Sequence, residues 1–248
     1  MLIIGAVLVI AVIGGVWFYG SSKPASSGPT NRAANSANTT KPSTIPANAP
    51  LGAQPPNQAG SPTAIVTLEE FADFQCPQCA AKHTVMRDIK AMYGTRIHFV
   101  FRENPLAIPA HDKSYDAAVA AEAAGMQGKF WDMQNQLFLN QQAWTAAPTY
   151  KQIWKDYAQR IGLDVEKWET DMAGLGAKTR VNADLERGKA LGVNSTPTLY
   201  INGANVDFND MTVAGIKGLI DAELQKAVSP KDAPATTANG AGAANSNK

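Results

Sequence analysis

Hydrophobic and polar positions alternate along residues 63–228 with two different periods, which indicate strands and helices within one folded body. Apolar and β-branched runs predict strands at 64–71, 96–102 and 198–201. Apolar residues that recur every three or four positions predict helices at 77–93, 114–126, 128–140, 150–161, 164–173, 178–191 and 211–227. The Asn202-Gly203 dipeptide predicts a hairpin that leads to a further strand at 206–208. Elements in this order predict an α/β fold with a mixed sheet and helices on its faces.

An uncharged apolar run occupies residues 2–19, ahead of this body. At about 1.5 Å of rise per residue, a helix of this length just spans a bilayer core of about 30 Å. Trp17 and Tyr19 close the run, as aromatic residues do at membrane interfaces. The run lacks a basic n-region and a clear cleavage site. Residues 1–20 are therefore predicted to form an uncleaved single-pass anchor, with a cleaved signal peptide or a buried core helix as the alternatives.

Two segments of low apolar content flank the body, at 21–62 and 229–248. Both are rich in small and polar residues and in proline, and nearly lack large apolar side chains. Chains of this composition do not bury enough surface to offset the entropy cost of ordering. The first segment is therefore predicted to be a flexible, disordered tether and the second a disordered tail.

Composition and charge narrow the function classes. The chain has 248 residues, of which 45% are hydrophobic and 17% charged, so a packed core is possible. Its net charge is +1, and no acidic residue precedes Glu69, so the basic excess lies outside a slightly acidic body. This argues against nucleic-acid binding, which needs a basic surface. Two cysteines form no disulfide framework and cannot alone complete a four-ligand zinc site.

Both cysteines lie in one motif, Cys76-Pro77-Gln78-Cys79, at the junction of a predicted strand and a predicted helix. The N-terminus of a helix favours negative charge and lowers the pKa of a thiol placed there. Proline suits the first helical turn, where its missing N–H is not needed. We expect Cys76 to be the attacking thiolate and Cys79 to be a buried resolving thiol, with exchange through a mixed disulfide.

Three other interpretations of the motif compete with this one. Half a zinc site would need two further ligands, and the three histidines, His83, His98 and His111, form no Cys/His cluster. A purely structural disulfide would close a very short loop and stabilise the fold little. Two inert buried cysteines are the third possibility. The redox interpretation is favoured, and it requires neither a metal nor a cofactor.

A second candidate feature is the dipeptide Thr196-Pro197, just before the predicted strand at 198–201. Proline is disfavoured inside a central strand, so Pro197 is expected at its start. An X-Pro bond can adopt the cis form at modest cost. A cis bond here would turn the backbone of Thr196 outward, where its N–H and C=O could pair with a substrate peptide as an added strand.

Three stretches together resemble the DsbA-like thioredoxin-fold family, and most of all its membrane-anchored bacterial branch. They are EFADFQCPQC at 70–79, GMQGKFW at 125–131 and GVNSTPT at 192–198, and the likeness extends over about residues 62–227. The resemblance implies a thioredoxin-like fold with a helical insert at about 112–175 that covers the active site. It also implies a cis bond between Thr196 and Pro197.

The same resemblance implies a function. Cys76 and Cys79 would be the catalytic pair, and Thr196 and Pro197 the substrate-binding residues. The protein is expected to be a thiol-disulfide oxidoreductase that oxidises cysteines of secreted or cell-envelope proteins and is reoxidised by a quinone-linked membrane partner. Disulfides persist outside the cytosol, so the body is expected on the extracytoplasmic side of the cell membrane, although Lys23 after the span weakly favours the opposite orientation.

The direction of exchange stays open at this point. Strongly oxidising members of the family carry a histidine in the central dipeptide, where this chain has the uncharged pair Pro77-Gln78. Oxidase, reductase and isomerase activities are therefore all compatible with the sequence. The alternative from another class is a tethered binding or holdase module in which the disulfide is only structural.

The remaining polar and aromatic residues receive weaker assignments. Glu69 is predicted at a solvated strand end, and Glu70 is left open between that position and a proton relay near Cys79. Asp73 is predicted as a turn residue, and Phe74 as a neighbour of the cysteine pair. The other assignments are core positions for Trp131, Trp144, Trp154 and Trp168, surface or strand-face positions for His83 and His98, and the rim of the cleft, without a catalytic role, for His111.

Overall fold

The structure is a computed structural model, and it describes residues 44–228. A five-stranded sheet with the order β1-β3-β2-β4-β5 forms its centre. The strands are β1 (Asn57–Gly60), β2 (Val66–Ala72), β3 (Ile97–Glu103), β4 (Thr198–Ile201) and β5 (Ala204–Asn205). β2 and β3 are parallel, and the other neighbouring pairs are antiparallel. The predicted mixed sheet is thus confirmed.

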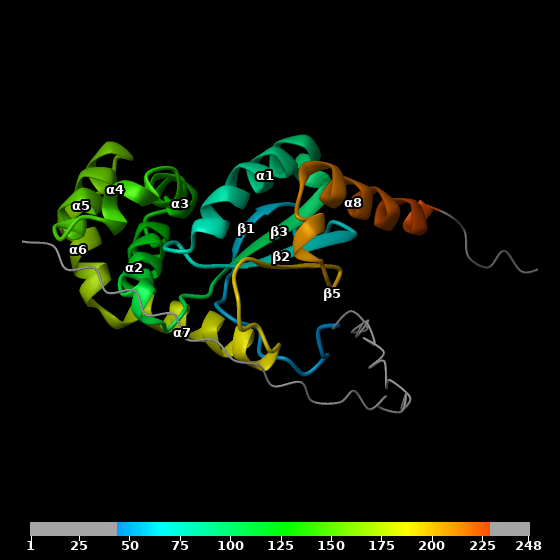
Figure 1. Ribbon diagram of the computed structural model, residues 1–248, viewed down its shortest axis with the longest axis horizontal. Helices are drawn as coiled ribbons and strands as arrows, with labels where there is room; N and C mark the ends of the chain where they lie inside the picture. The colour runs from blue at the N-terminus through cyan, green and yellow to red at the C-terminus, as the bar shows by residue number, and fades with distance from the viewer. Residues whose placement is uncertain (1–43, 229–248) are drawn as a thin grey trace, which may run out of the picture. The chain divides into compact units, whose positions relative to one another are not determined.

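β2 and β3 are buried along nearly their whole length, because helices cover both faces of the sheet. Figure 1 shows α1 (Pro77–Tyr93) and α8 (Val213–Val228) on one side of the sheet and α7 (Leu175–Ala190) on the other. In α1 the buried positions recur every three or four residues, as the sequence pattern predicts. Gly94 follows the helix with a φ of 53°, a left-handed conformation that glycine adopts without strain.

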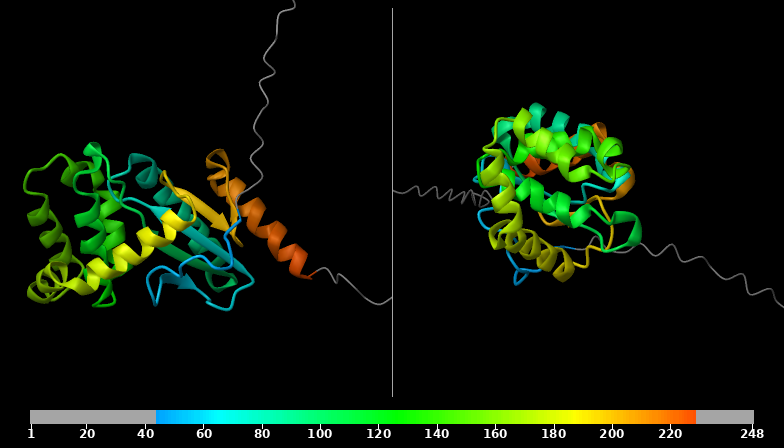
Figure 2. Two further views of the ribbon diagram at one scale, coloured as in Figure 1. Left: turned by 90° about the horizontal axis from the view of Figure 1, so that it is seen from below. Right: turned by 90° about the vertical axis from the view of Figure 1, so that its left-hand side faces the viewer.

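The chain between β3 and α7 forms the predicted helical insert, which Figure 2 shows gathered beside one end of the sheet. Its helices are α2 (Ser114–Gly125), α3 (Phe130–Leu139), α4 (Gln141–Thr145), α5 (Tyr150–Arg160) and α6 (Val165–Ala173). Trp144, Trp154 and Trp168 are fully buried in it, and the rings of the first two meet edge to face at 5.2 Å. Trp131 is partly buried against the sheet core. The core assignment is thus confirmed for Trp144, Trp154 and Trp168, whereas Trp131 lies at the edge of the core.

The last strand lies two residues earlier than predicted. Asn202 and Gly203 both have positive φ, so the turn is only two residues long and Ile201 pairs directly with Ala204. The predicted strand at 206–208 is wrong. After Val206 the chain leaves the sheet and forms the 3₁₀ turn Phe208–Asp210, in which the N–H of Asn209 donates to the Asp207 side chain. Two further 3₁₀ turns lie at Gly94–Arg96 and Pro109–His111.

The end of the predicted tether is folded, which corrects the boundary at residue 62. β1 pairs with β3, and Ala53 is buried, with its N–H donating to Asp184 at 2.8 Å. Arg102 and Arg187 donate to the carbonyls of Ala53 and Pro50. Hydrogen bonds from distant arginines therefore order this segment despite its low apolar content.

Glu69 is buried, which makes its predicted place at a solvated strand end wrong. Its carboxylate accepts hydrogen bonds from Arg102 at 2.6 Å and from Arg187 at 2.6 and 2.7 Å. Burial alone would raise the pKa of Glu69, but the two guanidinium groups hold this pKa below its usual value. The same two arginines bind the segment at 50–53, so one buried ionic network fixes β2, β3, α7 and the incoming chain together.

The predicted anchor at 1–20, the tether up to residue 43 and the tail at 229–248 lie outside the described residues. Between residues 44 and 228, no helix combines the length and apolar character needed to cross a bilayer.

Glu103 is a buried acid without a partner at the end of β3. Its side chain is 0% exposed, and neither carboxylate oxygen accepts a hydrogen bond from any group within residues 44–228. Burial, together with the nearby carboxylates of Glu122, Asp184 and Asp73, raises the pKa of Glu103 well above its usual value. The folded protein therefore favours the protonated form of this side chain.

We expect Glu103→Gln to stabilise the protein at alkaline pH. A folded-state pKa above the unfolded value of about 4.3 means that the folded state binds the proton more tightly, so the free energy of unfolding falls as pH rises past that value. Glutamine is neutral throughout, so the variant should lose this decline and gain about 1–3 kcal/mol over the unchanged protein at about pH 8 in urea unfolding. Exposed Glu166→Gln is the control. Parallel pH profiles for E103Q and the unchanged protein would contradict the assignment.

Candidate active site

The two cysteines lie where β2 leads into α1. Cys76 is the N-cap of the helix, Pro77 is its first residue, and both thiols are free. Cys76 is 6% exposed and Cys79, one turn along, is 1% exposed. β2 ends at the C-terminal edge of a parallel strand pair, the edge at which α/β folds gather functional groups. The predicted placement of the motif is thus confirmed.

The Thr196-Pro197 loop faces this motif from the other side. The bond between these residues is cis, as the family resemblance implies. In the thiol form, the Sγ atom of Cys76 donates to the carbonyl of Thr196 at 3.3 Å. β4 starts directly after Pro197, and Thr198 pairs with Phe71 of β2, so sheet register brings the loop to the cysteines. All four predicted site residues therefore meet in one place.

The surroundings separate the acidities of the two thiols. A hydrogen bond from Cys79 lowers the pKa of Cys76 most, burial opposes it, and the Thr196 side chain and the backbone N–H groups of Gln78 and Cys79 add to the lowering. The resulting pKa of Cys76 is about 5. Burial, and then its hydrogen bond to Cys76, raise the pKa of Cys79 well above the usual value. Near neutral pH the reduced site therefore holds one thiolate, at Cys76, and one thiol.

The Thr196 side chain affects the pKa of both cysteines. Its hydroxyl oxygen is buried and forms no regular hydrogen bond with the described part of the chain. The side chain nevertheless lowers the pKa of Cys76 and of Cys79. A hydroxyl can rotate its hydrogen toward a thiolate, so the Thr196 side chain favours the charged form, whereas the Thr196 carbonyl is an acceptor for the thiol form of Cys76.

Asp73 fixes the loop that carries Cys76. As predicted it is a turn residue, because its Oδ1 accepts from the N–H of Gln75 at 2.7 Å and its carbonyl accepts from the N–H of Cys76 at 3.1 Å. The same carboxylate is buried and also accepts from the Ser114 hydroxyl at 2.6 Å. Sequence reasoning missed this second role, because Ser114 belongs to the insert and no local pattern links the two residues.

His111 lies beside the site without contacting the cysteines. Its Nδ1 is 2.6 Å from the second oxygen of Asp73, which also accepts from the N–H of Leu106 at 2.9 Å. The imidazole is therefore bound to the carboxylate that organises the loop, and no direct catalytic role follows from its position.

Glu70 is buried in β2, so its solvated alternative is wrong. Burial raises the pKa of Glu70 to about 7, and the charge of Lys90 lowers it. Burial likewise lowers the pKa of Lys90 to about 8, and its ammonium lies over the rings of Phe99 and Trp131, at 4.9 and 4.2 Å from their centres. A carboxyl group that titrates near neutral pH suits proton exchange, and relay to Cys79 stays a prediction for Glu70.

His83 is buried, which contradicts its predicted surface position. Its Nε2 is 2.9 Å from Oδ1 of Asn135, its ring lies 4.9 Å from that of Phe138, and burial lowers its pKa to about 4. Phe138 also packs against Phe74, which is fully buried behind the cysteine motif. His98 is half-buried on β3, at the strand-face position predicted for it.

Within residues 44–228, no group of three or more His, Cys, Asp or Glu side chains is arranged to hold a metal ion.

A groove of about 590 Å³ opens next to the motif. It lies between Pro77, Ala80 and Ala81 of α1 and residues 138–143, where α3 ends and α4 begins. All nine lining residues are uncharged, so the groove presents apolar and amide groups beside the cysteines.

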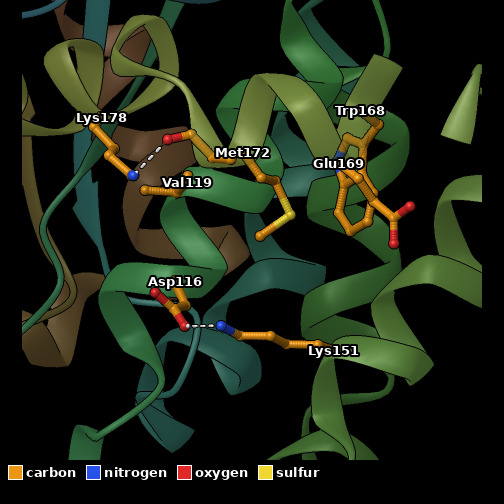
Figure 3. Close-up of a pocket in the computed structure, with 8 residues that line it drawn as sticks. Asp116, Val119, Lys151, Trp168, Glu169, Met172 and Lys178 are labelled. Atoms are coloured by element: carbon orange, nitrogen blue, oxygen red, sulfur yellow. Dashed lines mark hydrogen bonds and ion pairs between the residues drawn. The ribbon is translucent and has the colours of Figure 1, made fainter. Parts of the chain in front are cut away.

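A second cavity, of about 310 Å³, lies between α2, α5 and α6 of the insert and α7 (Figure 3). Lys151 pairs with Asp116 at 3.2 Å, and the Lys178 ammonium donates to the carbonyl of Ala173 at 2.8 Å. Glu169 pairs with Lys155. The charged groups of this cavity are thus already bound to protein groups, and it shares no lining residue with the cysteine site.

A strand that leads into a Cys-x-x-Cys helix, faced by a cis-prolyl loop across a mixed sheet, defines the class of thioredoxin-like dithiol proteins. The chain belongs to the thioredoxin family, whose model, described as Thioredoxin, matches residues 54–222.

Solved structures share the fold of this chain. A thioredoxin-like oxidoreductase from Silicibacter pomeroyi DSS-3 is 23% identical with a TM-score of 0.56, over 68% of this chain and 92% of that one. Oxidised BdbD from Bacillus subtilis is 23% identical with a TM-score of 0.56, over 68% and 93%. The protein α-DsbA1 from Wolbachia pipientis is 18% identical with a TM-score of 0.60, over 71% and 94%. The fold is thus that of DsbA-like thiol-disulfide oxidoreductases.

The curated sequence relatives are named as antiporters. The Na(+)/H(+) antiporter NhaA 1 of Mycolicibacterium gilvum is 35% identical over 156 residues, which are 62% of this chain and 24% of the antiporter. The protein of the same name from Mycolicibacterium vanbaalenii is 36% identical over 140 residues, or 56% and 22%. The chain spans less than a quarter of the length of these relatives.

Removing the Thr196 hydroxyl should make the Cys76 thiol less acidic. We expect the rate of iodoacetamide alkylation of the reduced protein to follow a pKa of about 5. Thr196→Val keeps the side-chain shape and should move this midpoint upward by roughly one pH unit, because it removes a donor to the thiolate. Thr198→Val, which removes a hydroxyl bonded to the carbonyl of Ser195, is the control. An unchanged midpoint in T196V would show that its hydroxyl does not stabilise the thiolate.

Proposed function

We propose that this protein is a thiol-disulfide oxidoreductase that forms or exchanges disulfides in secreted or cell-envelope proteins through Cys76 and Cys79. The observation that carries the proposal is geometric: Cys76 is the N-cap of α1 and lies 3.3 Å from the carbonyl of Thr196, Cys79 is buried one turn along, and this placement separates the two thiols in acidity. An inert or purely structural cysteine pair needs no such separation. A nucleophile with a resolving partner does, because only the thiolate attacks a disulfide.

In the oxidising direction, a substrate thiolate attacks the sulfur of Cys76 in the Cys76–Cys79 disulfide. The protein disulfide breaks, a mixed disulfide forms on Cys76, and Cys79 leaves and takes up a proton, as its raised pKa favours. A second substrate thiolate then attacks the substrate sulfur of the mixed disulfide. Cys76 leaves as a thiolate, and its low pKa makes it a good leaving group. The substrate loses two electrons, and the protein pair gains them.

The low pKa of Cys76 also favours oxidation of the substrate over its reduction. A thiolate held by several donors stabilises the reduced form of the pair, and a stabilised reduced form makes the disulfide a stronger oxidant. The same thiolate could attack a substrate disulfide, so reductase or isomerase activity is the alternative on this site.

Substrate peptides would pair with the backbone of Thr196 as an added strand, with Pro197 fixing the loop. The carbonyl of Thr196 already lies 3.3 Å from the Cys76 sulfur, so a peptide bound there would lie beside the reacting atom. Thr196 is half-buried, which leaves part of this residue open to a partner.

We further propose that the domain acts on the extracytoplasmic side of the cell membrane, anchored by residues 2–19, and is reoxidised by a quinone-linked membrane protein. The apolar run in the sequence and the persistence of disulfides outside the cytosol support this location. The region shared with the antiporters is a minor part of those proteins, and we propose no ion transport for this chain.

Cys79→Ser should trap the reaction half-way. In this variant Cys76 still attacks a substrate disulfide, but no resolving thiol releases it, so mixed disulfides should accumulate on non-reducing gels. Cys76→Ser should form none and should lose all oxidase and reductase turnover. If C76S retained the function of the protein, the holdase alternative, with a merely structural disulfide, would replace the enzymatic one.

The proposed orientation has its own test. A membrane-impermeant maleimide added to intact cells after mild reduction should label Cys76, and the double variant C76S/C79S should give the background signal. Labelling that requires lysis of the cytoplasmic membrane would overturn the extracytoplasmic placement without affecting the proposed chemistry.

A further inference from the structure

Gln141, the first residue of α4, joins the helical insert to the loop that carries the reactive cysteine. Its side-chain nitrogen donates to the carbonyl of Phe74 at 2.7 Å and to the carbonyl of Cys76 at 2.9 Å. A primary amide nitrogen has two N–H groups, so each carbonyl receives one of them. The residue is 9% exposed, so these bonds are largely shielded from water.

The two carbonyls depend on this amide to different degrees. That of Phe74 is buried and receives no other hydrogen bond from the described chain. That of Cys76 also accepts the first backbone bond of α1, from the N–H of Ala80 at 3.2 Å. A buried carbonyl without a donor is unfavourable, so the loop favours the conformation in which the Gln141 amide reaches both carbonyls.

These bonds also act on the charge of the sulfur. A carbonyl oxygen carries partial negative charge, and the carbonyl of Cys76 belongs to the same residue as the thiolate. Donors on such oxygens offset their negative potential, which would otherwise disfavour a nearby anion. The insert therefore supplies positive ends of N–H dipoles to the active-site loop from outside the thioredoxin core.

We propose that Gln141 is a positioning residue for thiol-disulfide exchange: its amide orients the backbone around Cys76 and shields the thiolate from two carbonyl oxygens. The inference deepens the function proposed above, because it assigns a specific part of the site's reactivity to the insert.

The neighbouring residue offers a matched control. Gln142 is also a glutamine in α4 and also lines the groove beside Pro77, but it is exposed, and its side chain forms no hydrogen bond within residues 44–228. Changing Gln142 alters the same groove while leaving both carbonyls paired.

The test compares full-length Q141M and Q142M with the unchanged protein. Methionine has nearly the same length as glutamine but no donor, so Q141M should raise the pH midpoint of Cys76 alkylation by iodoacetamide. A tenfold lower thiolate-to-thiol ratio corresponds to one pH unit. In equilibrium with glutathione, the cysteine pair of Q141M should be less oxidising than that of the unchanged protein. Q142M should match the unchanged protein in both measurements.

A second variant covers the case in which Q141M does not fold. Glutamate has the shape of glutamine and offers at most one donor when protonated and none when ionised, so Q141E should also raise the midpoint. An unchanged midpoint in a folded Q141M or Q141E, or an equal rise in Q142M, would overturn the role of Gln141. A midpoint near the ordinary value of about 8.5 in the unchanged protein would instead overturn the proposed function itself.

Discussion

The site depends on one interaction: the stabilisation of negative charge on the sulfur atom of Cys76. The groups that lower its pKa come from three parts of the chain: backbone N–H groups of α1, the thiol of Cys79, and the side chain of Thr196, which is 120 residues away. The first two are local and come with the helix. The third exists only when β4 pairs with β2 in the observed register, because that pairing brings the prolyl loop to the helix N-terminus. Reactivity at the sulfur is thus a property of the assembled sheet.

The helical insert is part of the same arrangement. It reaches the active-site loop from two sides through buried polar groups: Ser114 binds Asp73, and Gln141 binds the carbonyls of Phe74 and Cys76. The aromatic contact between Phe74 and Phe138 adds an apolar link at the same junction. Polar bonds in a buried place specify geometry more narrowly than apolar packing does. The insert therefore fixes the backbone on which the reactive residue stands, in addition to covering it.

The sequence alone predicts those parts of the structure that depend on short-range patterns. The strand-to-helix junction at Cys76 and the hairpin at Asn202-Gly203 are examples, because turn chemistry and hydrophobic period are local signals. Errors arose where a distant partner decides the outcome. Glu69 is buried because Arg102 and Arg187 neutralise it, and the nearer of the two lies 33 residues away.

Two other incorrect predictions, for His83 and for the segment at 44–62, also have distant partners as their cause. His83 follows a helical pattern in which it could face either way, and it is buried because Asn135 and Phe138 of the insert cover it. The segment at 44–62 has the composition of a linker, and it is ordered because backbone carbonyls accept bonds from arginines far along the chain. Composition measures how much apolar surface a segment can bury, and it does not measure how many donors the rest of the fold offers it.

The contacts of the first described residues, Thr44 and Ile45, have a consequence for the orientation of the domain. Thr44 and Ile45 pair with Gly203 and Ala204 at the tip of the β4–β5 hairpin. This tip lies beside the start of β2, whereas the cysteines follow its end. Whatever precedes residue 44 is consequently joined to the end of the sheet remote from the redox pair. A client chain can reach the sulfur from the side opposite to this attachment, with the length of the sheet between the two.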